Sequence, residues 1–128
     1  MIHAAESGNT AAITLLLDLG FPVDARGDDG GTPLHAAAYS GSAPAVRLLL
    51  DRGAGVEARD TTWDSTPMEW AAIGSGEQPA SRPHPDWTGT AQALLDAGAS
   101  ARDITLSPDD PKPPSPEVAA LLRRHGGQ

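Results

Sequence analysis

The chain has 128 residues, enough for one domain with a modest core. Its 9 basic and 17 acidic residues give a net charge of −8, and the basic residues are scattered, which argues against binding to a nucleic-acid backbone. The absence of cysteine excludes disulfides and thiol chemistry, and every apolar run is far shorter than the ~20 residues that a membrane helix needs.

The first segment with a clear pattern, residues 4–26, reads AAESGNTAAITLLLDLGFPVDAR. Two short apolar stretches lie on either side of Gly8, and the second ends at Gly20, a typical helix stop. We therefore expect two short helices, with Phe21 packing locally after the second. The N-terminus has no basic region and carries Glu6 early, so it does not resemble a signal peptide. Together with the lack of cysteine, this favours a cytoplasmic protein.

The second segment, residues 37–59, reads AAYSGSAPAVRLLLDRGAGVEAR and superimposes on residues 4–26 at an offset of 33. The alanine pair, the three leucines, the helix-stopping glycine and the final Ala-Arg all coincide. A period of this length indicates a repeat architecture. Before the segment, Thr32 is expected to cap a helix whose first residue is Pro33.

A third copy contains an interruption. STPMEWAAIGSG (65–76) matches the second copy at an offset of 34, and AQALLDAGASAR (91–102) matches it at an offset of 45. The change of offset places an insertion near residues 76–87, where prolines and polar residues predict a loop.

The fourth copy is partial. Residues 116–127, PEVAALLRRHGG, carry the leucine and glycine pattern of a second helix, whereas residues 103–116 contain five prolines and are expected to form a loop. Helices this short are marginal alone and must stack to bury their apolar faces. We therefore predict a single domain built from four successive units. The units are residues 1–26, 27–59, 60–102 with the insertion, and a degenerate C-terminal cap at 103–128.

The second unit carries the motifs of a known family. Residues 30–60, GGTPLHAAAYSGSAPAVRLLLDRGAGVEARD, resemble the ankyrin repeat in the Thr-Pro-Leu-His tetrapeptide, the Ala-Ala pair, the glycine at the helix turn, Leu-Leu and Gly-Ala. The resemblance implies an all-α solenoid of stacked antiparallel helix pairs, with β-turns or short hairpins projecting as fingers. It also implies a protein that binds another protein, without catalysis and without a cofactor.

Two departures bear on this interpretation. Glu69 stands where the third unit should have the histidine of the tetrapeptide, and the first unit starts at Met1, part-way into its first helix. The first unit is then either a frayed N-terminal cap or part of a longer array. In the second case the chain would be a terminal structural fragment of a longer ankyrin-repeat protein.

The resemblance places the residues after each Ala-Ala pair on the concave face and the loops between units in the fingers. Tryptophan and tyrosine are favoured anchors at interfaces, so Trp63 and Tyr39 are the leading candidates. The residues expected to contact a partner protein are Asp28, Asp29, Tyr39, Ser40, Thr61, Thr62, Trp63, Glu69, Trp70 and Ile73. The chain itself is expected to be a monomer.

His35 is the residue that most suggests catalysis, and a small hydrolase using His35 or His84 is the alternative function. The resemblance implies instead that His35 is structural, bonded near Thr32 and toward the next unit. His84 and Asp86 offer two metal ligands where zinc needs three or four, and the chain has no phosphate-binding glycine loop. Trp87 is expected to pack, fastening the insertion onto the second helix of the third unit.

Overall fold

The computed structural model describes residues 2–27, 30–77, 86–100 and 114–125. Within these ranges the chain forms helices and turns and no strand. The helices are α1 (Ile2–Ser7), α2 (Thr10–Asp18), α3 (Pro33–Tyr39), α4 (Ala43–Asp51), α5 (Pro67–Glu77), α6 (Trp87–Asp96) and α7 (Pro116–Arg124).

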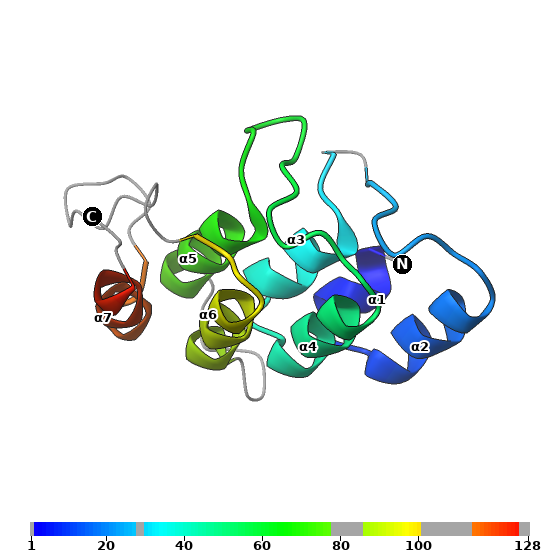
Figure 1. Ribbon diagram of the computed structural model, residues 1–128, viewed down its shortest axis with the longest axis horizontal. Helices are drawn as coiled ribbons and strands as arrows, with labels where there is room; N and C mark the ends of the chain where they lie inside the picture. The colour runs from blue at the N-terminus through cyan, green and yellow to red at the C-terminus, as the bar shows by residue number, and fades with distance from the viewer. Residues whose placement is uncertain (1, 28–29, 78–85, 101–113, 126–128) are drawn as a thin grey trace.

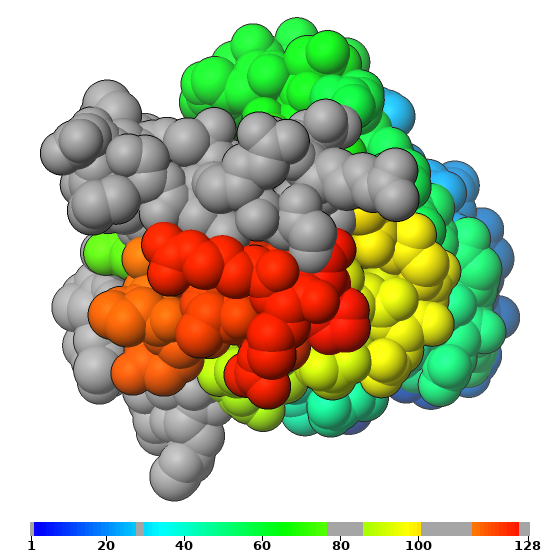
Figure 2. Space-filling view, turned by 60° about the vertical axis from the view of Figure 1, so that its left-hand side comes forward, coloured from blue at the N-terminus to red at the C-terminus, as the bar shows by residue number. Residues whose placement is uncertain are grey.

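The helices form two rows that run the length of the molecule (Figure 1). In the first row α1 contacts α3 and α3 contacts α5; in the second, α2 contacts α4 and α4 contacts α6. Helix α7 packs on both α5 and α6 and covers the C-terminal end (Figure 2). The all-α solenoid of stacked helix pairs expected from the sequence is confirmed. Its projecting loops are turns in the described residues.

The helices begin and end where polar residues and glycines occur in the sequence. Asn9 accepts a hydrogen bond from the backbone of Ala12 at 3.0 Å, and Asp86 accepts one from Gly89 at 2.8 Å. These side chains satisfy amides that have no partner in the first helical turn. The second-row helices each end at a glycine with a φ between 90° and 100°, as predicted; these are Gly20, Gly53 and Gly98.

The core is made of alanines and leucines from every unit. Leu49, Leu94 and Leu122 are fully buried at matching places in α4, α6 and α7. Small residues let α3 and α5 approach closely. A Cβ atom added at Gly74 would overlap the carbonyl oxygen of Tyr39. The distance between these two helices is therefore set by the absence of a side chain at residue 74.

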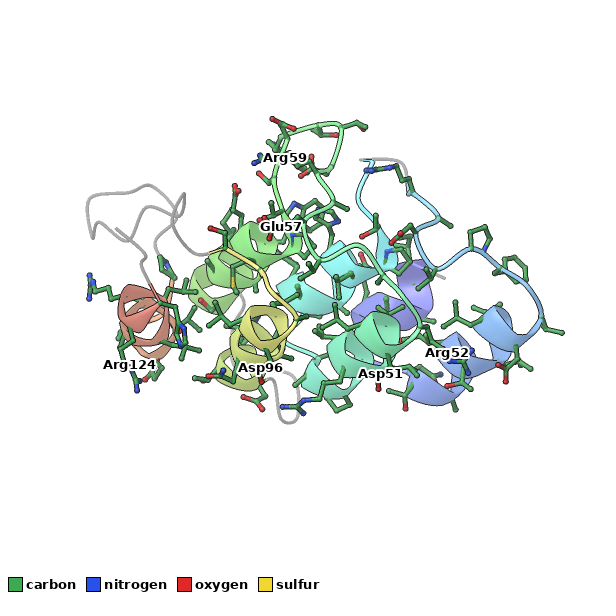
Figure 3. The ribbon with its side chains drawn as sticks, viewed as in Figure 1. Asp51, Arg52, Glu57, Arg59, Asp96 and Arg124 are labelled. Carbon is green, nitrogen blue, oxygen red and sulfur yellow. The ribbon has the colours of Figure 1, made fainter. Side chains whose placement is uncertain are left out.

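A recurring hydrogen bond links the first unit to the second and the second to the third. The Asp24 carboxylate accepts from the backbone N–H of Gly55 at 3.2 Å, and the Glu57 carboxylate accepts from that of Ser100 at 3.1 Å (Glu57 is labelled in Figure 3). Glu57 lies 33 residues after Asp24, and Ser100 lies 45 residues after Gly55, which are the offsets of the repeat. We call this series the carboxylate ladder.

The insertion was predicted near residues 76–87, but the helices on either side of it extend into that range. Helix α5 continues to Glu77, and α6 begins at Trp87 with Asp86 as its cap. Residues 78–85, which include His84, lie outside the described residues, as do residues 101–113, where the proline-rich loop was predicted. Among the described helices none is long and apolar enough to cross a bilayer.

Replacing Gly74 with alanine should destabilise the fold. Alanine is a better helix former than glycine by about 1 kcal/mol, but the new Cβ would force α5 away from the backbone of α3. We expect the cost of overpacking to exceed the gain in helix propensity. The free energy of unfolding, measured by urea denaturation, should then fall by about 1–3 kcal/mol.

Gly55→Ala is the matched control for this substitution. A Cβ there meets the Ala58 side chain at 3.5 Å and the Asp24 carboxylate at 3.7 Å, both ordinary van der Waals distances. The free energy of unfolding should then change by no more than about 0.5 kcal/mol. A Gly74→Ala variant as stable as Gly55→Ala would show that contact between α3 and α5 is looser than described.

Candidate functional site

Two loops project beside the first helix row, and we call them finger 1 (residues 27–31) and finger 2 (residues 60–65) (Figure 1). In each finger the N–H of the first residue donates to the carbonyl of the last, at 2.9 Å in finger 1 and 3.0 Å in finger 2. Finger 2 is one residue longer. Asp64 takes a φ of 54° where finger 1 has Gly30 with a φ of 78°. The described residues of the two fingers are therefore closed in the same way.

The fingers are fastened to each other. Arg26 donates from one guanidinium nitrogen to the carbonyl of Gly30 in finger 1 and, at 2.7 Å, to that of Arg59 beside finger 2. A side chain at Gly30 would overlap Thr61, so finger 1 lies directly against finger 2. Arg59 in turn donates to the backbone of finger 2 (Figure 3). Finger 2 is held by its neighbour as well as by its own turn.

The Asp60 carboxylate organises finger 2 from inside. It is 2% exposed and accepts from the backbone amides of Thr62, Trp63 and Ser65. It also accepts from the indole nitrogen of Trp70 on α5, at 2.8 Å. Burial raises the pKa of Asp60, but these four hydrogen bonds outweigh burial, so the pKa lies below the usual value of an aspartate. The carboxylate thus ties the finger backbone to α5.

Asp60 was absent from the residues predicted from the sequence. It aligns with Gly27 of finger 1, so the repeat pattern does not mark it. A signal was present, because an aspartate opening a polar loop often bonds to amides two or three residues later. The hydrogen bond from Trp70 joins a helix to the loop, and the spacing of residues in the sequence could not predict it.

The structure brings together three of the predicted aromatic residues. The Trp70 ring lies edge-on to Trp63 at a centroid distance of 5.7 Å and to Tyr39 at 6.2 Å. It also contacts His35, at 5.1 Å. Trp70 and Tyr39 are half-buried, whereas Trp63 is 63% exposed. Helix α5 therefore supports an aromatic surface, and Trp63 is its most exposed part.

His35 has a structural role, as the resemblance implied. It is fully buried; its Nδ1 accepts from the backbone N–H of Thr32 at 3.0 Å, so Nε2 carries the proton and donates to the Ser65 carbonyl at 2.8 Å. The Thr32 hydroxyl is the helix cap, so Thr32 and His35 form a capping box for α3. Nδ1 is occupied in capping α3 and Nε2 in holding α3 to finger 2, which opposes a catalytic role.

Glu69 takes the place of this histidine in the third unit and retains the local part of its role. Its backbone N–H donates to the Thr66 hydroxyl at 3.3 Å, and that hydroxyl lies 3.5 Å from its carboxylate. The departure from the family tetrapeptide is thus a Thr-x-x-Glu capping pattern. Glu69 is half-buried, so part of it is open to solvent.

The other predicted contact residues separate into three groups. Thr61 and Thr62 are exposed on finger 2, and Ile73 is half-buried on α5. Ser40 is only 4% exposed because it lies at the tight turn after α3, so it offers a partner almost no surface. Asp28 and Asp29 lie outside the described residues.

Trp87 packs, as predicted, but against a different element. It is the first residue of α6, and its indole nitrogen donates to the Tyr39 carbonyl at 3.1 Å. Its ring lies where a side chain at Gly41 or Gly74 would have to go. It therefore fastens α6 to the end of α3 in the preceding unit. In the described part of the chain, no three His, Asp or Glu side chains are grouped to hold a metal ion.

Comparison with known proteins agrees with this geometry. The family model of ankyrin repeats in three copies matches residues 1–80. The crystal structure of the human ASB11 ankyrin repeat domain superimposes with a TM-score of 0.72 and 21% sequence identity, over 96% of this chain. The chain spans 52% of the length of that structure. No curated protein matches the chain in sequence.

Replacing Asp60 with asparagine should destabilise the protein in a pH-dependent way. Asparagine turns one acceptor oxygen into a donor that faces donors, which should lower the free energy of unfolding by about 1–3 kcal/mol at pH 7. Because folding lowers the pKa of Asp60, the wild-type advantage should be full above the unfolded pKa of about 3.9. It should shrink as the pH falls through the folded pKa.

Urea denaturation of wild type and Asp60→Asn measures this difference in the free energy of unfolding. A series from pH 7 to pH 2.5 spans the aspartate pKa of about 3.9. Asp64→Asn, on the exposed side of the same finger, serves as the control and should show little change. A constant difference between wild type and Asp60→Asn across the whole range would contradict the ionised state assigned to Asp60.

Proposed function

Because this chain belongs to the ankyrin repeat family, whose repeats generally act as protein–protein interaction modules, we propose that it binds a partner protein through the aromatic face. We define the aromatic face as finger 2 together with the residues of α3 and α5 beside it. Its members are Tyr39, Thr61, Thr62, Trp63, Glu69, Trp70 and Ile73.

The observation that carries this proposal is the exposed indole of Trp63 on a rigid support. A tryptophan that is 63% exposed leaves a large apolar surface in water, which a partner can cover. Asp60 bonds to the Trp63 backbone, and Trp70 packs against its ring. A side chain held in place before binding loses less entropy when the partner arrives. Trp63 has the properties of an interface hot spot.

The aromatic face is continuous between two units. Tyr39 at the end of α3 and Trp70 on α5 lie 6.2 Å apart by ring centroid, and the Trp63 ring lies 5.7 Å from that of Trp70. A partner that covers Trp63 therefore meets side chains from both units. Such shared recognition surfaces are how stacked repeats bind extended segments of other proteins.

The hydrolase alternative has little support in the described residues. The ankyrin fold is typically non-catalytic. His35 is fully buried and uses both ring nitrogens in structural hydrogen bonds. A general base must reach a substrate proton, which this histidine cannot do without breaking the contact between α3 and finger 2.

Truncating the aromatic face should weaken partner binding and leave the fold intact. We expect Trp63→Ala to lower the affinity for a partner captured from native lysate by roughly thirtyfold, which corresponds to about 2 kcal/mol. Tyr39→Ala should act in the same direction. Calorimetric titration of the purified partner against each variant measures the change, and circular dichroism reports the helical content.

Arg47→Ala provides the control, because Arg47 is an exposed long side chain on α4, in the other helix row. Its affinity should match that of the wild type. Equal affinity for wild type and Trp63→Ala would exclude the aromatic face as the binding surface. Unfolding of Trp63→Ala would show that the indole supports the fold.

A further inference from the structure

The helices of the first row carry acidic residues and neither lysine nor arginine. Glu6 lies exposed on α1, where the second unit has Tyr39, and Glu69 lies half-buried on α5. Among the described helices, arginine occurs only on α4 and α7. Because the fingers project beside the first row, the helices that border them are acidic (Figure 1).

The acidic residue of α5 shares the open side of that helix with the aromatic face. Glu69, Trp70 and Ile73 are half-buried, whereas Ala71 and Ala72 between them are buried. Ile73 follows Glu69 by four residues and Trp70 by three, which are the spacings at which helix side chains are neighbours. A carboxylate therefore belongs to the surface that carries the Trp70 indole.

The Glu69 carboxylate can accept further hydrogen bonds, whereas that of Asp60 cannot. A carboxylate can accept about four hydrogen bonds, and Glu69 has the Thr66 hydroxyl at 3.5 Å, the long end of the range. Asp60 is 2% exposed and already accepts from three backbone amides and the Trp70 indole. Of these two carboxylates, Glu69 is the one that a partner can reach.

The rings of the aromatic face are suited to a cation. The Trp70 indole donates its N–H to the Asp60 carboxylate at 2.8 Å, and hydrogen bonding to an anion increases the electron density of the ring. The Trp63 ring lies 5.7 Å from that ring and is 63% exposed. The negative face of an indole attracts a cation within about 6 Å, more strongly than a phenyl or phenol ring does. Trp63 can therefore bind a positive group as well as an apolar one.

The two arginines that precede the fingers are engaged with the finger backbone. Arg26 donates to the carbonyls of Gly30 and Arg59. Arg59 donates to the Asp64 carbonyl at 2.8 Å and lies 3.8 Å from the Asp64 carboxylate (Arg59 is labelled in Figure 3). The positive charge of Arg59 is thus partly offset within finger 2, and Glu69 is left as the acidic group on the open side of α5.

We propose, resting on the proposed function, that the partner segment bound by the aromatic face is basic, with an arginine stacked on the Trp63 indole and a positive charge paired with Glu69. The net charge of −8 attracts such a segment before contact. Arginine fits this surface better than lysine, because its planar group stacks on aromatic rings and is more weakly hydrated. Its several N–H groups also match a carboxylate.

Other segments fit the aromatic face less well. An acidic segment would meet the like charges of Glu69 and Glu6, which opposes binding. An apolar segment would cover Glu69 and remove water from a carboxylate without supplying a donor or a counter-charge. A basic segment avoids both costs and still covers the apolar surface of Trp63.

Calorimetric titration with blocked peptides tests the proposal. The probes are a glycine-serine peptide that contains several arginines and the same peptide with citrulline, which has the shape of arginine without its charge. Wild type should bind the arginine peptide at least about tenfold more tightly than the citrulline peptide. Its affinity should fall between about 20 mM and about 300 mM salt, because salt screens the attraction.

Variants of the aromatic face separate stacking from the burial of apolar surface. Trp63→Phe keeps an aromatic ring, whereas Trp63→Leu keeps only an apolar side chain. The affinity for the arginine peptide should fall about tenfold in Trp63→Leu and less in Trp63→Phe. Glu69→Gln preserves the Thr-x-x-Gln capping pattern and removes the charge, so it should lower the affinity about fivefold. Circular dichroism checks that each variant is folded.

Phe21 and Asp51 supply matched controls on the other helix row. Phe21 follows α2 and, although it was expected to pack locally, is 52% exposed. Asp51 is exposed at the end of α4 (Figure 3). Phe21→Leu removes an exposed aromatic ring and Asp51→Asn removes one negative charge. Each should bind the arginine peptide within about twofold of wild type.

Three results would overturn the proposal. The first is equal affinity of wild type for the arginine and citrulline peptides, or no binding of the arginine peptide at about 1 mM. The second is an equal loss of affinity in Glu69→Gln and Asp51→Asn, which would show attraction by net charge alone. The third is equal affinity of Trp63→Leu and Trp63→Phe, which would show that Trp63 contributes only apolar surface.

None of these results would exclude the proposed function, because a captured partner whose binding needs Trp63 can present a neutral segment there. The proposed function fails separately, when Trp63→Ala binds that partner as tightly as wild type does.

Discussion

Each described helix of this protein buries its apolar side against helices of its own and neighbouring units, and the rest of the structure follows from that constraint. The helices have between six and eleven residues, a length at which isolated helices are marginal in water. Each is stabilised by contact with its neighbours in the row, so burial is a property of the stack. The alanines and Gly74 matter for this reason: they set the distance at which neighbouring helices can share a core.

The same stacking explains how a loop can become a rigid binding element. A loop with few internal contacts would be mobile, but finger 2 is bonded to α3 through His35 and to α5 through Trp70. Asp60 joins these contacts to the backbone that carries Trp63. Rigidity of the exposed indole thus comes from helices on either side of the finger. A substitution that moves α3 away from α5 would therefore disturb the aromatic face even if it replaced none of the residues of that face.

The sequence predicted the fold because the repeat contains residue types with strong local structural preferences. Thr-Pro marks a helix start, glycine with positive φ marks a stop, and the common offset locates one unit on the next. Tyr39, Trp63 and Trp70 were identified as surface candidates from the family resemblance and from the preference of interfaces for aromatic residues. Burial of Ser40 and the role of Asp60 escaped detection, because each depends on a contact between elements that spacing cannot show.

The two ends of the solenoid differ because the first unit breaks the repeat where the repeat makes contacts. Leu19 and Pro22 stand where the second unit has an ion-pairing arginine, Arg52, and a hydrogen-bond donor, Gly55. At the other end α7 carries exposed arginines and keeps its leucines inside. The first unit therefore keeps the helices of the repeat but not all of the contacts that the second unit makes.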